Sequence, residues 1–271
     1  MIDGLAGGAG LTPALFGLLV GFLVGLTGVG GGSLMTPFLL SLGIPAPTAV
    51  GTDLVYATVT KMTGSVQHYR QRSVNLEVAL FLGLGSIPAS LLGVQTLEWI
   101  KNAFDAETVQ SIMVTIIAAT LVLVGASLIF KAFLPERWVK DQKTAWDGKS
   151  SMSLKRRLFT VLFGATGGYL VGLTSIGSGS VMAVILLLLY PLAPAVVVGT
   201  DIAHATVLSL VTGFAHMLHG NVDFALAGTL LLGSIPGVLI GSRLAPRLPG
   251  KPLTIILAIM LVFVGVRLLL S

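Results

Sequence analysis

The sequence predicts an all-α integral membrane protein made of two inverted repeats of transmembrane helices, each opening with a glycine-broken helical hairpin. Three observations lead to this fold class: the composition, a series of long apolar segments, and an internal duplication. Of the 271 residues, 54% are hydrophobic and 10% are charged, and the mean hydropathy is +0.96. A water-soluble domain would carry roughly 25% charged residues. The composition therefore places the chain in a lipid bilayer.

The composition also excludes several kinds of site. The chain has no cysteine, so it has no disulfides, catalytic thiolates or thiolate metal ligands. Its net charge of +5 would suit a nucleic-acid partner only if the cations formed one face, but they lie between apolar segments. His216 and His219 are one helical turn apart but have no evident third metal ligand. We therefore expect no nucleic acid, no metal and no cofactor.

Eight apolar segments divide the chain, and most could cross about 30 Å of hydrocarbon as helices that rise 1.5 Å per residue. The first and fifth are too long for one simple span. Small residues interrupt both, with TGVGGGS at residues 27–33 and TSIGSGS at residues 174–180. The segments cover residues 12–43, 46–68, 76–97, 106–134, 158–190, 194–219, 222–244 and 252–270.

The two halves of the chain are repeats. A shift of 148 positions aligns GTD at residues 51–53 with GTD at 199–201, and GSIP at 85–88 with GSIP at 233–236. A shift of 147 aligns the two glycine breaks. Duplication around broken helices is typical of secondary transporters, whose sites lie near the midplane where the halves meet. The predicted parts are a first repeat at residues 1–134, a basic linker at 135–157 and a second repeat at 158–271.

Lys and Arg placement predicts the orientation in the membrane, because cytoplasmic loops are enriched in these residues. Arg70 and Arg72 follow the second segment, Arg243 and Lys251 flank the loop before the last, and the linker is basic. All three loops fall on the cytoplasmic side if each broken segment enters the membrane and returns. This arrangement inverts the second half relative to the first and places both termini outside.

The glycine breaks predict a site for an anion. Glycine-rich backbone followed by a short helix exposes N–H groups at a positive helix end, and Ser33 and Ser180 are candidate N-caps. The alternative is that the glycines only permit close helix packing. A Walker loop is excluded, because no Gly-Lys-Ser/Thr follows. The candidate substrate-binding residues of the breaks are Thr27, Gly30, Gly31, Gly32, Ser33, Thr174, Ser175, Gly177, Ser178, Gly179 and Ser180.

Few ionisable residues lie inside the apolar segments, and each is a functional candidate, because a charge in the membrane is costly. Asp53 and Asp201 follow Gly-Thr in the two repeats. They are candidates for binding a coupling proton or sodium ion, and structural capping is the alternative. Lys61 lies eight residues beyond Asp53 on nearly the same helix face. It could bind an anionic substrate or extend to the interface.

Three neighbours of the carboxylates complete the candidate substrate site. Thr52 and Thr200 directly precede Asp53 and Asp201. His204 stands one turn beyond Asp201, where the first repeat has Tyr56, and could donate a hydrogen bond to an oxyanion. A neutral core histidine is the alternative.

Several motifs together resemble the TauE/SafE family of membrane transporters over essentially the whole chain. They are GVGGGSLMTP at residues 28–37, IPAPTAVGT at 44–52, the two GSIP turns and HGNVD at 219–223. The second break departs from the family pattern, since GSGS replaces the triple glycine and Val184 stands in the place of Pro37.

The resemblance implies a transporter that exports sulfite, sulfoacetate or related C2 to C3 sulfonates. We expect a secondary transporter, not an enzyme, that works by alternating access and spans the cell membrane several times, as in the bacterial inner membrane. A passive anion channel, or an uptake permease for another small carboxylate or oxyanion, is the alternative. The expected partners are a small anion, a coupling proton or sodium ion and the lipid bilayer, and the sequence leaves the oligomeric state open.

Overall fold

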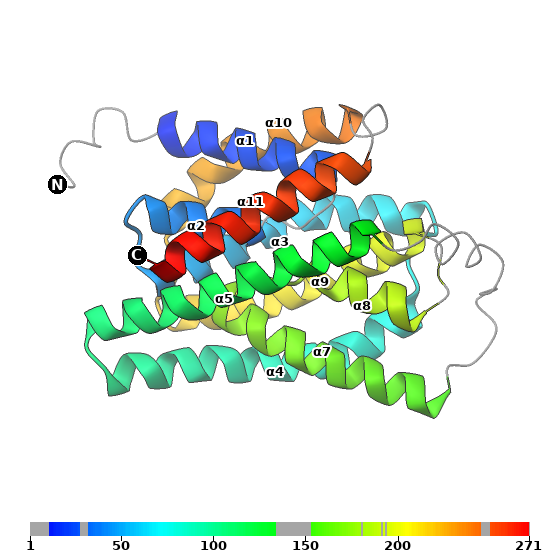
Figure 1. Cartoon of the computed structure of the whole chain (residues 1–271), viewed down its shortest axis with the longest axis horizontal. Helices are drawn as coiled ribbons and strands as arrows, with labels where there is room; N and C mark the ends of the chain where they lie inside the picture. Colours follow the sequence, from blue (N-terminus) through cyan, green and yellow to red (C-terminus); the bar gives the residue numbers. More distant parts are fainter. Residues whose placement is uncertain are drawn as a thin grey trace.

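Ten α-helices and no strand form the part of the chain that the computed structural model describes (Figure 1). The described residues are 11–27, 32–133, 153–179, 181–190, 192, 194–244 and 250–270. The helices are α1 (Leu11–Thr27), α2 (Gly32–Ser41), α3 (Ala46–Arg70), α4 (Leu76–Ala103), α5 (Ala106–Phe133), α7 (Leu154–Thr174), α8 (Val181–Leu189), α9 (Pro194–Leu218), α10 (Phe224–Leu244) and α11 (Gly250–Leu270). Among them, α4, α5, α9, α10 and α11 are long and apolar enough to cross a membrane. The predicted all-α membrane fold is confirmed.

Both of the long segments form a pair of helices. α1 ends at Thr27 and α2 begins at Gly32. α7 ends at Thr174, and Ser175 then takes a left-handed conformation (φ 62°) while its N–H donates to the Val171 carbonyl at 2.8 Å. The 10 residues of α2 and the 9 residues of α8 extend about 15 Å and about 14 Å, against a hydrocarbon thickness of roughly 30 Å. Neither short helix can cross the membrane alone.

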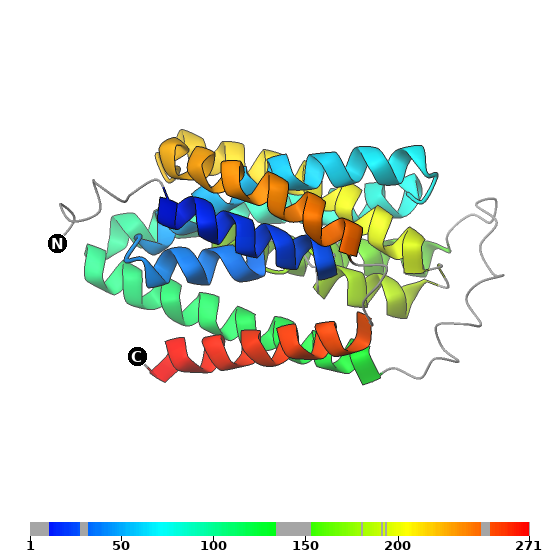
Figure 2. The same ribbon diagram turned by 90° about the horizontal axis from the view of Figure 1, so that it is seen from above.

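Each main helix pair joins one helix of the first repeat to one helix of the second. α1 packs on α10 and α7 packs on α4, which is the same contact made twice, while α3 packs on α9 and α5 on α11 (Figures 1 and 2). α5 and α11 are equivalent helices, and the sequence colours show them running in opposite directions (Figure 1). The helices of the two repeats therefore enclose a common centre where equivalent positions meet.

Glycines allow close contact in the pairs α1–α10 and α7–α4. Gly21 of α1 lies against the backbone of Ser234 in α10, and the equivalent Gly168 of α7 lies against Ser86 in α4. A Cβ at either position would collide with the facing backbone. Close helix packing, the alternative interpretation of the glycine excess, therefore accounts for these positions outside the breaks.

Replacing Gly168 with leucine is expected to lower the thermal stability of the purified protein. The added side chain would push α7 away from the Ser86 backbone of α4, and such overpacking costs about 1–3 kcal/mol. Each kcal/mol corresponds to a shift of about 2–4 °C in Tm for a chain of this size. Gly228→Ala in α10 is the matched control, because a Cβ there would meet nothing within 4 Å. Equal melting temperatures for G168L and the unaltered protein would contradict this packing.

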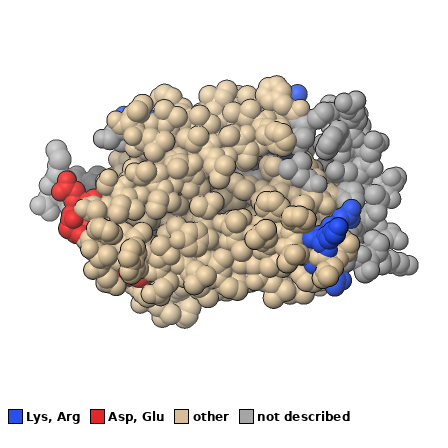
Figure 3. Space-filling model, turned by 60° about the horizontal axis from the view of Figure 1, so that its bottom comes forward, with Lys and Arg blue, Asp and Glu red and all other residues tan. Residues whose placement is uncertain are grey.

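On the face drawn in Figure 3, positively and negatively charged residues gather at opposite ends of a surface that carries few other charges. Lys and Arg cluster at one end, where Arg70 ends α3, Arg72 lies in the turn after it, and Arg156 and Arg157 lie in the first turn of α7. Asp and Glu cluster at the other end, where the turn from α4 to α5 holds Asp105. We call these the basic end and the acidic end. α1 begins and α11 ends at the acidic end (Figure 1).

Candidate functional site

The two helix breaks meet at the buried carboxylate of Asp53. Thr36 Oγ1, in α2, donates to Asp53 Oδ2 at 2.6 Å and lies 3.5 Å from the Thr174 carbonyl at the end of α7. Gly32, the first residue of α2, lies so close to the Ser175 carbonyl that a Cβ would collide with it. That Cβ would also lie 3.3 Å from Asp53 Oδ2. The start of α2, the end of α7 and the middle of α3 therefore converge on one side chain.

Two buried polar atoms beside this contact have no hydrogen-bond partner among the described residues. They are the second carboxylate oxygen of Asp53, Oδ1, and the hydroxyl of Ser175, which lies near enough to the Asp53 carboxylate to interact with it without forming a hydrogen bond of good geometry. Both residues are almost fully buried. A buried polar atom without a partner is costly, so such atoms occur mainly where a proton, ion, water or ligand completes them. The meeting point of the breaks has capacity for one of these.

The buried Lys61 side chain brings its ammonium group from α3 to the second break and to α9. Its Nζ donates to Ser178 Oγ of the second break at 2.6 Å and lies 3.5 Å from Ser209 Oγ in α9. Ser209 is the residue that corresponds to Lys61 at the offset of 148, so equivalent positions of the two repeats touch here. The ammonium also interacts electrostatically with Asp53 and Asp201. Lys61 is buried and does not extend to the interface.

A cavity of about 480 Å³ opens beside this ammonium group. Its lining includes Ser178 and Gly179 of the second break beside Lys61 and Asp201, and Asp201 Oδ1 has no hydrogen-bond partner among the described residues. The lining continues along α3 to His68, near the basic end. Ligand pockets for small molecules measure about 300–1,000 Å³. The cavity therefore offers a small ligand one ammonium group, one carboxylate and several hydroxyls, those of Thr60, Thr63, Ser178 and Ser242.

Other predicted residues have partners elsewhere. Thr52 Oγ1 accepts from the Asp223 backbone N–H at 3.0 Å, just before α10, and Thr200 Oγ1 accepts from the Asn75 N–H at 2.9 Å, just before α4. These two contacts are equivalent, and each holds the start of a helix of the opposite repeat. The structure does not bring Thr52 or Thr200 to the cavity.

The remaining break residues are dispersed. Thr174 Oγ1 donates to the Leu170 carbonyl at 2.7 Å and accepts from the Ile176 N–H at 3.1 Å. Ser33 lies in the first turn of α2 rather than at its N-cap, because the helix begins at Gly32, and it lines a separate cavity between α1, α2 and α11. Gly177 has a positive φ of 107° within the second break, and Thr27 ends α1. Gly30, Gly31 and Ser180 lie outside the described residues.

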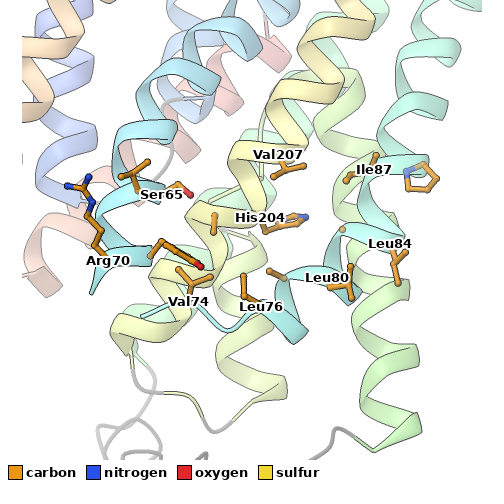
Figure 4. A pocket seen from close by; sticks show the side chains of 15 residues that line it. Ser65, Arg70, Val74, Leu76, Leu80, Leu84, Ile87, His204 and Val207 are labelled. Atoms are coloured by element: carbon orange, nitrogen blue, oxygen red, sulfur yellow. The ribbon is translucent and has the colours of Figure 1, made fainter. Parts of the chain in front are cut away.

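His204 borders a larger cavity of about 1010 Å³ between α3, α4 and α9 (Figure 4). The lining is mainly apolar, with side chains such as Leu80, Leu84 and Val207, and Arg70 stands at one side (Figure 4). His204 Nε2 lies 2.7 Å from Ser86 Oγ, while its Nδ1 has no partner among the described residues. A small anion would find little to bind along this apolar wall, so the cavity beside Lys61 is the better candidate site.

Comparison with known protein families identifies the family of this chain. The pattern described as Sulfite exporter TauE/SafE matches residues 13–268. The chain belongs to the TauE/SafE family. This confirms the resemblance in the sequence motifs and makes the protein a membrane transporter.

Individual relatives agree with this assignment. The Bacillus subtilis protein called probable membrane transporter protein YjnA is 43% identical over 94% of this chain and 98% of its own length. YunE, a second probable membrane transporter protein of Bacillus subtilis, is 24% identical over 94% of this chain and 95% of its own. Sulfite exporter TauE/SafE family protein 3 of Arabidopsis thaliana is 33% identical, but over 27% of this chain and 16% of its own. These names indicate a transporter, not an enzyme. The comparison with solved structures found no match.

Two residues of this TauE/SafE protein's central site were absent from the sequence prediction. Thr36 bonds Asp53, and Ser209 lies beside the Lys61 ammonium. Thr36 stands three residues after Ser33 but bonds Asp53, whereas Ser33 lines the separate cavity between α1, α2 and α11, so the spacing did not reveal Thr36. Ser209 was identifiable as the counterpart of Lys61, but its contact with Lys61 depends on how the repeats pack.

Proposed function

We propose that the protein exports small sulfur-containing oxyanions, such as sulfite, sulfoacetate or related C2 to C3 sulfonates, across the bacterial inner membrane by alternating access. The family assignment supports the class of substrate. The observation that carries the proposal is the buried Lys61 ammonium, which faces a cavity of about 480 Å³ at the second helix break. A cation inside a membrane protein is costly to retain and typically marks a substrate or ion pathway.

The anion is proposed to bind at the polar part of this cavity. Lys61 Nζ and the Ser178 hydroxyl already form a hydrogen bond of 2.6 Å, and both can donate to an oxyanion. α8 begins at Val181, directly after the break, so its positive end adds to the attraction for negative charge. Gly179 in the lining leaves room for a ligand beside this backbone. The first break is proposed to contribute in the same way when the cavity opens toward it.

Asp53 and Asp201 are proposed to bind the coupling proton or sodium ion. Asp201 lines the same cavity as Lys61, so an ionised carboxylate there would repel the transported anion. A proton or sodium ion on Asp201 removes this repulsion. Export of a monoanion from a cell with a negative interior is already favoured by about 2.3 kcal/mol per 100 mV. The coupled ion would therefore control loading of the site more than it supplies the driving force.

The repeats are proposed to be inverted across the membrane, with the basic end in the cytoplasm and both termini outside. The opposite directions of α5 and α11 (Figure 1) and the separation of charge (Figure 3) support this orientation. A cysteine at position 271 should then react with an impermeant thiol reagent on intact cells. Reaction after lysis alone would contradict the orientation.

A substrate screen tests the proposed function. Purified protein in detergent should gain thermal stability with sulfite or a C2 to C3 sulfonate, and less with taurine or simple carboxylates, because ligands that bind the folded state stabilise it. In proteoliposomes the same anions should show saturable exchange. A flux that neither saturates nor responds to proton or sodium gradients would instead establish a passive anion channel. Stabilisation by carboxylates alone would establish the uptake or exchange of another oxyanion.

A further inference from the structure

The cavity beside Lys61 has a counterpart in the other repeat that is closed. Gly64 and Val238 line the open cavity, and at the offset of 148 they correspond to Thr212 and Ser90. Thr212 and Ser90 are completely buried. The equivalent surroundings of Asp53 and Asp201 therefore differ: Asp201 faces a cavity and Asp53 faces packed side chains.

Two hydrogen bonds between helices close the counterpart. Thr212 Oγ1 donates to Ser90 Oγ at 2.8 Å and joins α9 to α4. His216 Nε2 donates to the Gly172 carbonyl at 2.9 Å and joins α9 to α7. On the open side Gly64 and Val238 carry no polar side chains, so these two positions form no hydrogen bond equivalent to that of Thr212 and Ser90.

The equivalent histidine takes a different partner on the open side. His68 Nδ1 lies 2.9 Å from Ser73 Oγ, in the turn that follows its own helix. Gly25, the counterpart of Gly172, lines the cavity instead of receiving a histidine. The equivalent histidine and glycine of the two repeats are thus in contact on the closed side and apart on the open side.

A polar cluster at the acidic end secures the closed side. Lys101 Nζ donates to Glu98 Oε1 at 3.0 Å and to Asn221 Oδ1 at 2.7 Å. Asn221 Nδ2 donates to Glu98 Oε1 at 2.7 Å and lies 3.4 Å from His216 Nδ1. The sequence has Pro246 and Pro249 at the positions equivalent to Glu98 and Lys101. The second repeat therefore does not carry this pair of charged residues in its sequence.

We propose that Ser90, Thr212, His216 and Gly172 line a second access site for the transported anion, which is closed in this structure and opens toward the acidic end. The inference rests on the proposed function, because alternating access requires a route on each side of the membrane. Opening moves α9 away from α4 and α7 while the cavity beside Lys61 closes. Glu98, Lys101 and Asn221 form the latch that holds the second site shut.

Paired cysteines test this second site, and the cysteine-free chain makes the experiment clean. In S90C/T212C the sulfur atoms replace hydroxyls that are 2.8 Å apart, so mild oxidation should form a disulfide in the substrate-free protein and stop oxyanion exchange in proteoliposomes. Reduction should restore exchange. The matched pair is G64C/V238C on the open side, where a Cβ at position 64 would meet Ile202 at 3.5 Å and no atom of Val238 within 4 Å. This pair should cross-link mainly during exchange.

The outcomes separate the two proposals. Cross-linked S90C/T212C that exchanges the anion as fast as its reduced form would overturn the second access site while leaving the proposed function intact. A pair that does not oxidise in the folded protein would overturn it too, because the side chains would not be in contact. If the unaltered protein exchanges no sulfur oxyanion, the proposed function itself fails. The rate at which an impermeant thiol reagent labels T212C is a direct measure of opening. Labelling should be faster in T212C/K101M than in T212C with Lys101 retained.

Discussion

Lys61→Met is expected to lower the exchange of sulfite or sulfonate by about 10- to 100-fold. Among the described residues that line the cavity of about 480 Å³, Lys61 is the one Lys or Arg. A hydrogen bond to a charged group contributes about 1.5–3 kcal/mol, which corresponds to this range of affinity. Methionine keeps much of the length of the side chain and removes the charge. The measurement is tracer exchange in proteoliposomes together with a binding titration.

The control for Lys61→Met must separate binding from folding, because removing one member of a buried charged group leaves the others uncompensated. Lys61→Arg keeps the positive charge and should retain part of the exchange. The double variant K61M/D201N removes a positive and a negative charge together, so it should fold at least as well as K61M and bind the anion about 10- to 100-fold more weakly than D201N. An anion affinity in K61M/D201N equal to that of D201N would show that Lys61 is not the anion site.

Asp201→Asn is expected to bind the anion at least about tenfold more tightly and to lose the response of exchange to a proton or sodium gradient. Asparagine has the shape of the protonated acid and cannot repel an oxyanion. Two charges 4 Å apart interact by about 4 kcal/mol at an effective dielectric constant of 20, so relief of even a third of this repulsion gives a tenfold change. Binding titrations at several pH values and exchange under imposed gradients measure both effects.

Asp53→Asn is the matched comparison, because Asp53 is the equivalent residue on the closed side. Its carboxylate is bonded to Thr36 and does not line the open cavity. We therefore expect D53N to change resting anion affinity much less than D201N and to slow turnover. A gradient response that survives in both variants would remove the coupling role from the two carboxylates.

The fold was largely predictable because its signals are local. The long apolar segments predict the helices, and runs of small residues predict the breaks near Gly32 and Ser175. The duplication is also visible without a structure. The boundaries were less predictable: α4 continues to Ala103, beyond the apolar segment that ends at residue 97, because a helix extends past the membrane core where its polar residues reach water.

The site was predictable only in part, since contacts across the repeats decide it. Asp201 and Lys61 were identified as rare charges, but whether Lys61 reached a substrate or the interface depended on Ser178, 117 residues away. Thr52 and Thr200 adjoin the carboxylates in sequence, yet successive residues on a helix point in directions about 100° apart. Their hydroxyls consequently meet the Asp223 and Asn75 backbones instead of the cavity.

The most direct test of the central claim is exchange of radiolabelled sulfite or sulfoacetate by purified protein in proteoliposomes, compared between the unaltered protein, K61R and K61M. The proposed mechanism predicts saturable exchange in the unaltered protein, partial exchange in K61R and about 10- to 100-fold slower exchange in K61M. All three proteins should be monodisperse. Exchange in K61M at the rate of the unaltered protein would contradict an anion site built on Lys61.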